Sequence, residues 1–363
     1  MSIQTSPKAP AHNVSPPSSD LRVQPLPRWA PAGALLAGAL LAAGFSLVLT
    51  GAVTVVPLVV FTILLTTAII TIASRMTEGP RRALDRFVTC LVVTAFAIAM
   101  VPLVSLVIEV ISRGLTRLDA EFFSSSMVGV IGEGGGVYHA ILGTLIITLI
   151  TAVISVPIGL FAAIYLVEYG RVGRLPKAIT FLVDVMTGIP SIVAGLFAFA
   201  LFALFLGPGV KLGIAGAVAL SVLMIPVVVR SAEEILKLVP NELREAAYAL
   251  GVPKWRTIVK IVLPTSAAGL TTGVTLAIAR VIGETAPLLI TVGSTNGTNV
   301  NPFDGRMSTL PVYSYYSFTQ PGIPPAFSID RAWAAALVLI AIVMALNLIA
   351  RLISRRFAPK TGR

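Results

Sequence analysis

The sequence is poor in charged residues, cysteine and histidine. Only 12% of its 363 residues are charged, whereas about 25% is usual for soluble domains. Cys90 is its one cysteine, which excludes a disulfide within the chain and a metal site built from cysteines. His12 and His139 are too few and too far apart to indicate a metal site. Neither GxxxxGKS nor GxxxxGKT occurs, so the chain carries no P-loop of its own, and we predict neither a metal nor a cofactor.

Long apolar runs dominate the chain instead. Hydrophobic residues make up 56% of it and the mean hydropathy is +0.92, which is typical of an integral membrane protein. A transmembrane helix needs about 20 apolar residues. On this measure the sequence predicts an all-α, polytopic membrane protein with about eight transmembrane helices, at residues 30–50, 53–74, 87–111, 139–167, 178–206, 213–229, 267–292 and 332–352.

The composition divides the chain into four predicted parts. Residues 1–28 are rich in proline and serine and are expected to form a disordered cytoplasmic tail. They lack the apolar core of a signal peptide, so the first apolar segment is expected to be retained as an anchor. The other parts are a transmembrane hairpin at 29–75 with a tight turn at Gly51, a six-helix core at 87–353, and a cytoplasmic tail at 354–363.

The basic residues are distributed unevenly between the predicted loops. With the N-terminus inside, the cytoplasmic segments hold 21 of the 27 Lys and Arg residues, the outer segments hold 5, and Arg280 lies within a span. Cytoplasmic loops of membrane proteins carry such an excess of Lys and Arg. Topology, with both termini in the cytoplasm, therefore explains the net charge of +11 without nucleic-acid binding. The five outer residues are Arg113, Arg117, Lys211, Arg306 and Arg331.

A charged, amphipathic stretch at residues 231–265 lies between two apolar segments. Gly251 is expected to end its first helix, because glycine takes a positive φ without strain. Pro253 fits the first turn of a second helix, which Pro264 is expected to close. A DNA-binding helix-turn-helix also uses two helices and a glycine turn, but no folded basic domain surrounds this stretch. We predict a docking surface for a protein partner, carried by Glu245, Ala246, Ala247, Gly251, Pro253, Trp255, Leu263 and Pro264.

Two opposite charges lie inside the seventh predicted span. Arg280 is thirteen residues into that span, or about 20 Å at about 1.5 Å per residue, which is near the bilayer midplane. A charge there costs about 2.5–3.5 kcal/mol and is expected to face the bundle interior or a wet cavity. Glu284 follows on the same predicted helix face, and Pro287 leaves the carbonyl of Gly283 without a donor. With Thr285, these residues indicate a polar pathway; the alternative is a structural ion pair that locks two helices.

Two more acidic residues lie in predicted spans. Asp184 precedes a break expected at Pro190, and we assign it to the same pathway. Glu109 ends the third span, where an end residue that reaches the interface is the alternative. If these groups and Glu284 relayed protons, the protein would be a secondary transporter. The aromatic residues of the outer segment 293–331 fit an interfacial belt and contact with an extracytoplasmic partner equally well.

Several of these motifs resemble those of ABC-importer permeases. Glu245-Ala246-Ala247, Gly251 and Leu263-Pro264 stand at the spacings of the EAA loop, which in that family is the cytoplasmic coupling helix that inserts into the ATP-hydrolysing subunit. Within this family the chain is most similar to the phosphate-specific permeases of the PstA type. The resemblance covers about residues 87–353 and is carried by the stretches 165–171, 188–195, 243–251 and 279–288.

The resemblance implies a permease subunit of an ATP-driven importer for inorganic phosphate in the bacterial plasma (inner) membrane. It also implies that the chain is no enzyme, because ATP hydrolysis belongs to a separate subunit. The implied partners are a second permease of the PstC type, a dimer of ATP-binding subunits and an extracytoplasmic phosphate-binding protein. Arg280 and Glu284 fall on the family's intramembrane charged positions, whereas the hairpin at 29–75 is absent from its six-helix members.

Two functions other than phosphate import are possible: an ABC permease for another oxyanion and a proton-coupled secondary transporter. A single arginine cannot discriminate phosphate from sulfate or molybdate, so the choice of phosphate rests on the resemblance. A proton-coupled secondary transporter is disfavoured, because it has no ATPase for the EAA loop to engage.

Overall fold

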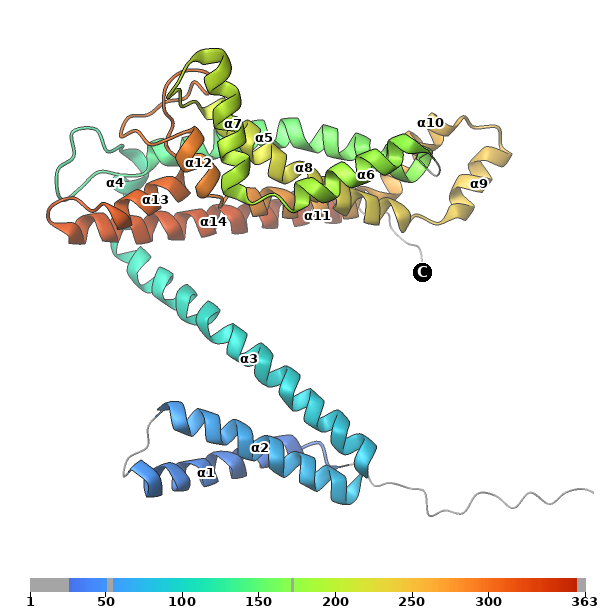
Figure 1. Ribbon diagram of the computed structural model, residues 1–363, viewed down its shortest axis with the longest axis vertical. Coiled ribbons are helices and arrows are strands. Elements are labelled where there is room, and N and C mark those ends of the chain that lie inside the picture. The colour runs from blue at the N-terminus through green and yellow to red at the C-terminus, as the bar shows by residue number, and fades with distance from the viewer. Residues whose placement is uncertain (1–25, 51–54, 171–172, 358–363) are drawn as a thin grey trace, which may run out of the picture. The chain divides into compact units, whose positions relative to one another are not determined.

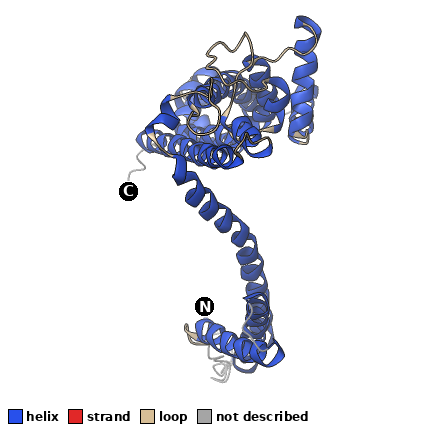
Figure 2. Cartoon of the chain, turned by 90° about the vertical axis from the view of Figure 1, so that its left-hand side faces the viewer, coloured by secondary structure: helices blue, strands red, loops and turns tan. Residues whose placement is uncertain are grey.

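The computed structural model describes residues 26–50, 55–170 and 173–357. Within these ranges every regular element is a helix and no strand occurs (Figure 2), which confirms the predicted all-α class. Residues 1–25 of the tail expected at 1–28 lie outside the described residues, as do the turn at Gly51, Arg171 and residues 358–363 of the C-terminal tail.

The helices belong to two compact units, residues 1–106 and 107–363. The first unit contains the predicted hairpin, in which α1 (Ala30–Thr50) packs against α2 (Val55–Thr77). Their backbones approach closely at Gly38, where an added Cβ would lie 3.0 Å from the backbone nitrogen of Thr66. The predicted spans at 30–50 and 53–74 thus correspond to α1 and α2.

The turn between α2 and α3 (Pro80–Gly114) is held by Glu78. Its carboxylate accepts hydrogen bonds from the Ser74 hydroxyl at 2.7 Å and from the Leu26 backbone N–H at 2.8 Å, and the Arg86 guanidinium lies 3.4 Å away. These donors, the Ser74 hydroxyl first, lower the pKa of Glu78 to about 2, because they stabilise the charged form. Glu78 therefore stays ionised, and the turn keeps its hydrogen bonds, at any physiological pH.

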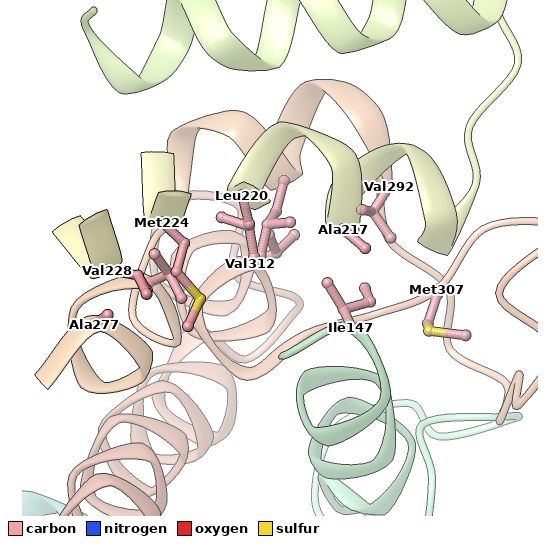
Figure 3. Packing of buried hydrophobic residues seen from close by; sticks show 11 residues of the cluster. Ile147, Ala217, Leu220, Met224, Val228, Ala277, Val292, Met307 and Val312 are labelled. Atoms are coloured by element: carbon pink, nitrogen blue, oxygen red, sulfur yellow. The ribbon is translucent and has the colours of Figure 1, made fainter. Parts of the chain in front are cut away.

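The second unit is organised around α5 (Tyr138–Ile164) and α8 (Gly213–Lys237), which pack along their lengths. Small residues let them approach: a Cβ on Gly159 would lie 2.6 Å from the Val228 side chain. The buried side chains of Ile147, Leu220 and Met224 lie in one apolar cluster between these helices and their neighbours (Figure 3). The neighbours in this cluster are α11 (Leu263–Val281), α12 (Ala286–Thr291) and α13 (Leu310–Thr319), and α14 (Pro325–Phe357) packs against α11 and α13.

The predicted number of spans is confirmed, but the fifth span is not one helix. Among the described residues seven helices are long and apolar enough to cross a membrane, and a bent pair brings the number to eight. The pair consists of α6 (Arg174–Thr187) and α7 (Ser191–Leu206), which meet at 107° at the break expected near Pro190 within the predicted span 178–206. Pro190 lies at the bend with an extended backbone (φ −60°, ψ 141°), and its missing N–H cannot continue the α6 ladder.

The seventh span begins earlier than expected. One helical run extends from Lys254 to Val281 and contains α10 (Lys254–Thr257), the π-helical segment η4 (Ile258–Val262) and α11. The prediction that Pro264 closes a short second helix is therefore wrong. The physical reason is the π-helical turn: the N–H of Leu263 bonds to the carbonyl of Ile258, five residues back, so the helix re-registers and passes through Pro264.

The same span ends earlier than expected. α11 stops at Val281, the chain leaves the helix over residues 282–285, and α12 (Ala286–Thr291) starts separately. The prediction that Arg280 and Glu284 share a helix face is therefore wrong. Gly283 is a poor helix former, and Pro287 is accepted at the start of a new helix, where its missing N–H costs nothing.

Candidate functional site

A cavity of about 210 Å³ lies where the two interrupted spans approach each other. The α6–α7 bend contributes Thr187 and Ser191, the end of α11 contributes Arg280, and the segment between α11 and α12 contributes Glu284. α8 closes one side at Pro226. The remaining lining residues are Met186, Ile189, Leu223 and Val227.

The two interruptions are held together by packing between α7 and α12. A Cβ on Gly195 of α7 would lie 2.7 Å from the Cα of Pro287 in α12, so only a glycine lets these backbones come so close. Gly195, Pro287 and Leu288 are buried at this contact. The cavity is therefore fixed by helix packing, although its walls come from residues about one hundred positions apart.

Arg280 is not neutralised within the described residues. Its side chain is exposed and Glu284 is half-buried, yet neither forms an ion pair within 4.0 Å of any described residue. Thr285, predicted beside them, precedes α12 and does not line the cavity. The N–H donors of this guanidinium are therefore not used by an ion pair within the described residues.

Asp184, predicted for the same pathway, lies elsewhere. Its carboxylate pairs with Arg230 of α8, which also contacts Glu233 at 2.9 Å. Lys237 lies 2.7 Å from Glu233 and extends the network. Asp184 lines a separate cavity with Glu233 and Lys237, because it precedes the α6–α7 bend by a full helical turn. Glu109 likewise pairs with exposed Arg113 near the end of α3.

The predicted helix–glycine–helix unit has the expected stop. α9 (Asn241–Ala249) ends before Gly251, which has φ +73°. The N–H of Gly251 bonds to the carbonyl of Tyr248 at 2.9 Å, and that of Val252 to the carbonyl of Ala247 at 3.1 Å, as expected for a glycine-terminated helix. α10 follows Pro253.

One face of α9 packs on the bundle and the other is free in this chain. Arg244 and Ala247 are buried, whereas Glu245 and Ala246 are exposed. Apolar side chains on the free side are strongly exposed, with Leu250 at 84% and Trp255 at 58%. Burial of these apolar side chains against a partner would stabilise the complex by about 25 cal/mol per Å² of apolar area removed from water.

A buried ion pair that ties α9 to the bundle was not predicted. The Arg244 guanidinium donates to Glu168 at 2.8 and 3.0 Å and to the carbonyls of Leu236 and Val239 at 3.1 and 2.6 Å. Glu168 lies in η3 (Tyr165–Tyr169), the π-helical end of α5. Both side chains are almost fully buried. In the sequence, only the position of a carboxylate directly after the apolar α5 segment indicates that Glu168 has a buried partner.

The chain resembles known transport proteins in sequence. Residues 155–363 match the family described as binding-protein-dependent transport system inner membrane component. The phosphate transport system permease protein PstA 1 of Mycobacterium tuberculosis is 48% identical over 276 residues, which cover 75% of this chain and 89% of that protein. The PstA protein of Pasteurella multocida is 42% identical over 244 residues, 67% of this chain and 84% of that one. The chain belongs to this permease family.

The permease also shares its fold with a solved structure. A bacterial ABC transporter involved in the import of the acidic polysaccharide alginate gives a TM-score of 0.52 over 79% of this chain and 100% of that one, at 14% identity. At this identity the likeness concerns the fold alone. Family and helices together define a multi-pass inner-membrane permease of the PstA type, as the sequence motifs predicted.

Proposed function

We propose that the permease imports inorganic phosphate as one subunit of an ATP-driven transporter. The choice of substrate is carried by the 48% identity to a phosphate transport permease. The unpaired Arg280 supplies a fitting chemistry, because a guanidinium presents a planar fork of donors to an oxyanion. Glu284, in the same cavity, weakens the binding by its negative charge, so that the ion is released rather than trapped.

The permease has no covalent chemistry of its own in this proposal. A dimer of ATP-binding subunits hydrolyses ATP, and the free side of α9 and α10, with Leu250 and Trp255, docks against it. A second permease of the PstC type covers the exposed side of the Arg280 cavity, and an extracytoplasmic binding protein delivers phosphate. Both termini and the α9–α10 unit lie in the cytoplasm, in keeping with the excess of Lys and Arg there.

Phosphate uptake should depend on this chain. In bacterial cells without other phosphate importers that express the permease with its partner subunits, radiolabelled phosphate should accumulate while ATP is available, including after a protonophore is added. Excess unlabelled phosphate should suppress the signal, and equal sulfate or molybdate should not. Equal suppression by sulfate would assign another oxyanion, and collapse on protonophore addition at constant ATP would favour a proton-coupled carrier.

The hairpin at residues 29–75 is proposed to be an anchor outside the transport core. Deletion of residues 1–77, which ends at the last residue of α2, removes two spans, so the remaining basic loops still orient the core. We expect uptake to persist at lower membrane abundance, measured per molecule of permease by quantitative immunoblotting. Complete loss of uptake at normal abundance would instead make the hairpin part of the mechanism.

A further inference from the structure

A second polar cavity, of about 530 Å³, lies beyond the C-terminal end of α12. Two cationic side chains, Lys211 and Arg306, line it together with the polar residues Ser294, Thr295 and Asn296. It lies at the end of the second unit opposite to α9 and α10, where α12 and α13 meet the long loops (Figure 1). Gly293, Tyr316 and Gln320 complete the lining.

The two cations converge over one glycine. Gly293 has φ +73°, and a Cβ added there would lie 2.9 Å from the Cδ of Lys211 and 3.4 Å from the Cδ of Arg306. The aliphatic parts of both side chains therefore pack over the backbone of Gly293, in the space that a side chain at this position would fill. Lys211 comes from the loop before α8 and Arg306 from the loop before α13. The fold therefore holds two positive charges close together although they repel each other.

No carboxylate compensates these charges within the described residues. The one polar contact of Lys211 there is a long one, 3.5 Å from its Nζ to the carbonyl of Leu289. The three other cations of the predicted outer segments are all engaged: Arg113 by Glu109, Arg117 by Asp119, and Arg331 by the carbonyls of Gly132 and Gly134. Lys211 and Arg306 are thus the two outer cations that have neither a carboxylate nor a short hydrogen bond among the described residues, and they share a cavity.

The walls of the cavity are held by specific hydrogen bonds. The Ser308 hydroxyl accepts from the N–H of Thr295 at 2.9 Å and donates to the carbonyl of Thr295 at 2.6 Å. The Asn299 amide donates to the carbonyl of Arg306 at 3.0 Å. The N–H of Leu212, next to Lys211, bonds to the carbonyl of Thr291 at 3.0 Å. The Lys211 segment is therefore fixed to the last residue of α12, and the Arg306 segment to the loop that follows α12, before any ligand arrives. This lowers the ordering cost of binding.

One short helix separates this cavity from the Arg280 cavity. α12 has 6 residues, so it is about 9 Å long at about 1.5 Å per residue. Glu284 precedes it and Gly293 follows it. From these observations we infer that Lys211 and Arg306, with Ser294 and Thr295, form an outer binding site for a phosphate oxyanion ahead of Arg280. The inference rests on the proposed function for its ligand.

Occupancy of this site can be measured without transport. The full-length permease in nanodiscs of neutral phosphatidylcholine is treated with an amine-acylating reagent, and modification of Lys211 is followed by mass spectrometry. Phosphate should slow this modification relative to chloride of equal ionic strength, by about threefold at a concentration of twice its dissociation constant, because protection follows site occupancy. Lys260, exposed on η4 and far along the chain, serves as the internal reference and should not respond.

Two variants decide between specific binding and general charge effects. Arg306→Gln should abolish the protection by phosphate while leaving Lys211 reactive. Arg113→Gln removes one positive charge from an exposed ion pair outside the cavity and should leave the protection intact. Protection that persists in Arg306→Gln, or that chloride reproduces, would overturn the site.

A lipid headgroup offers the same phosphate chemistry. If phosphatidylglycerol nanodiscs protect Lys211 and free phosphate adds nothing, the site belongs to lipid and the inference is wrong. The results that would refute this site differ from those that would refute the proposed function. Protection without phosphate uptake by the assembled transporter would refute only phosphate import, and uptake without protection would refute only this outer site.

Discussion

Replacement of Arg244 by Gln should uncouple the permease from its ATPase while leaving it in the membrane. Arg244 joins α9 to Glu168 and to two carbonyls near the end of α8, and both charges of the pair are buried. Loss of one partner of a buried ion pair costs about 3–5 kcal/mol, because the other charge remains uncompensated. That cost exceeds what a nine-residue helix can gain alone in water, so α9 should detach from the bundle.

The readouts are co-purification of the ATP-binding subunit and stimulation of ATP hydrolysis at matched permease abundance. Both should fall strongly in Arg244→Gln and in Glu168→Gln. The combined apolar replacement Arg244→Met, Glu168→Leu should restore part of the association, since it leaves no unpaired charge. Arg113→Gln is the matched control, because Arg113 belongs to an exposed ion pair with Glu109 on α3 and lies outside the α9–α10 docking surface. Normal stimulation in Arg244→Gln would show that the pair does not position α9.

Replacement of Arg280 by Gln should abolish phosphate uptake while the transporter still assembles and hydrolyses ATP. The coupling surface lies at the start of the helical run Lys254–Val281, whereas Arg280 lies at its end, so the coupling surface is untouched. A hydrogen bond to a charged group contributes about 1.5–3 kcal/mol, which corresponds to roughly a 10- to 160-fold loss of rate. Arg280→Lys should retain part of the activity, since Lys keeps the charge but loses the planar fork.

Lys260→Gln is the control for the loss of one charge from the same helical run, and it should transport normally. Measurements of initial uptake rate at matched membrane abundance compare the three variants. Uptake in Arg280→Gln equal to that in Lys260→Gln would remove Arg280 from the translocation path.

The sequence alone predicted the features that depend on composition and local pattern. Apolar length located the candidate spans, and the φ of +73° at Gly251 follows from its place after an amphipathic helix. In contrast, the assumption of one straight helix gave the wrong result for Arg280 and Glu284, which do not share a helix face. Gly283 and Pro287 were visible, but whether a proline kinks a span or ends it depends on the packing available, here the contact of Pro287 with Gly195.

Contacts between distant segments were beyond local reasoning. Arg244 and Glu168 are 76 residues apart, and each is unremarkable in its own segment. Asp184 was assigned to the pathway because it precedes the Pro190 break, yet the partner that engages it, Arg230, lies on α8. Lys211 and Arg306 were counted only as two scattered outer charges. Their convergence depends on the loop after α12, which no periodicity in the sequence describes.

Phosphate uptake by the Arg280→Gln, Glu284→Gln double variant, beside each single variant at matched abundance, tests the central claim most directly. The structure places both residues at one cavity without an ion pair between them, a statement that covers the described residues. If Arg280 binds the translocated anion, neutralising Glu284 as well cannot replace the lost charge, and the double variant should stay as inactive as Arg280→Gln. Recovery to near wild-type uptake would contradict this, because it would make Arg280 only the structural partner of Glu284.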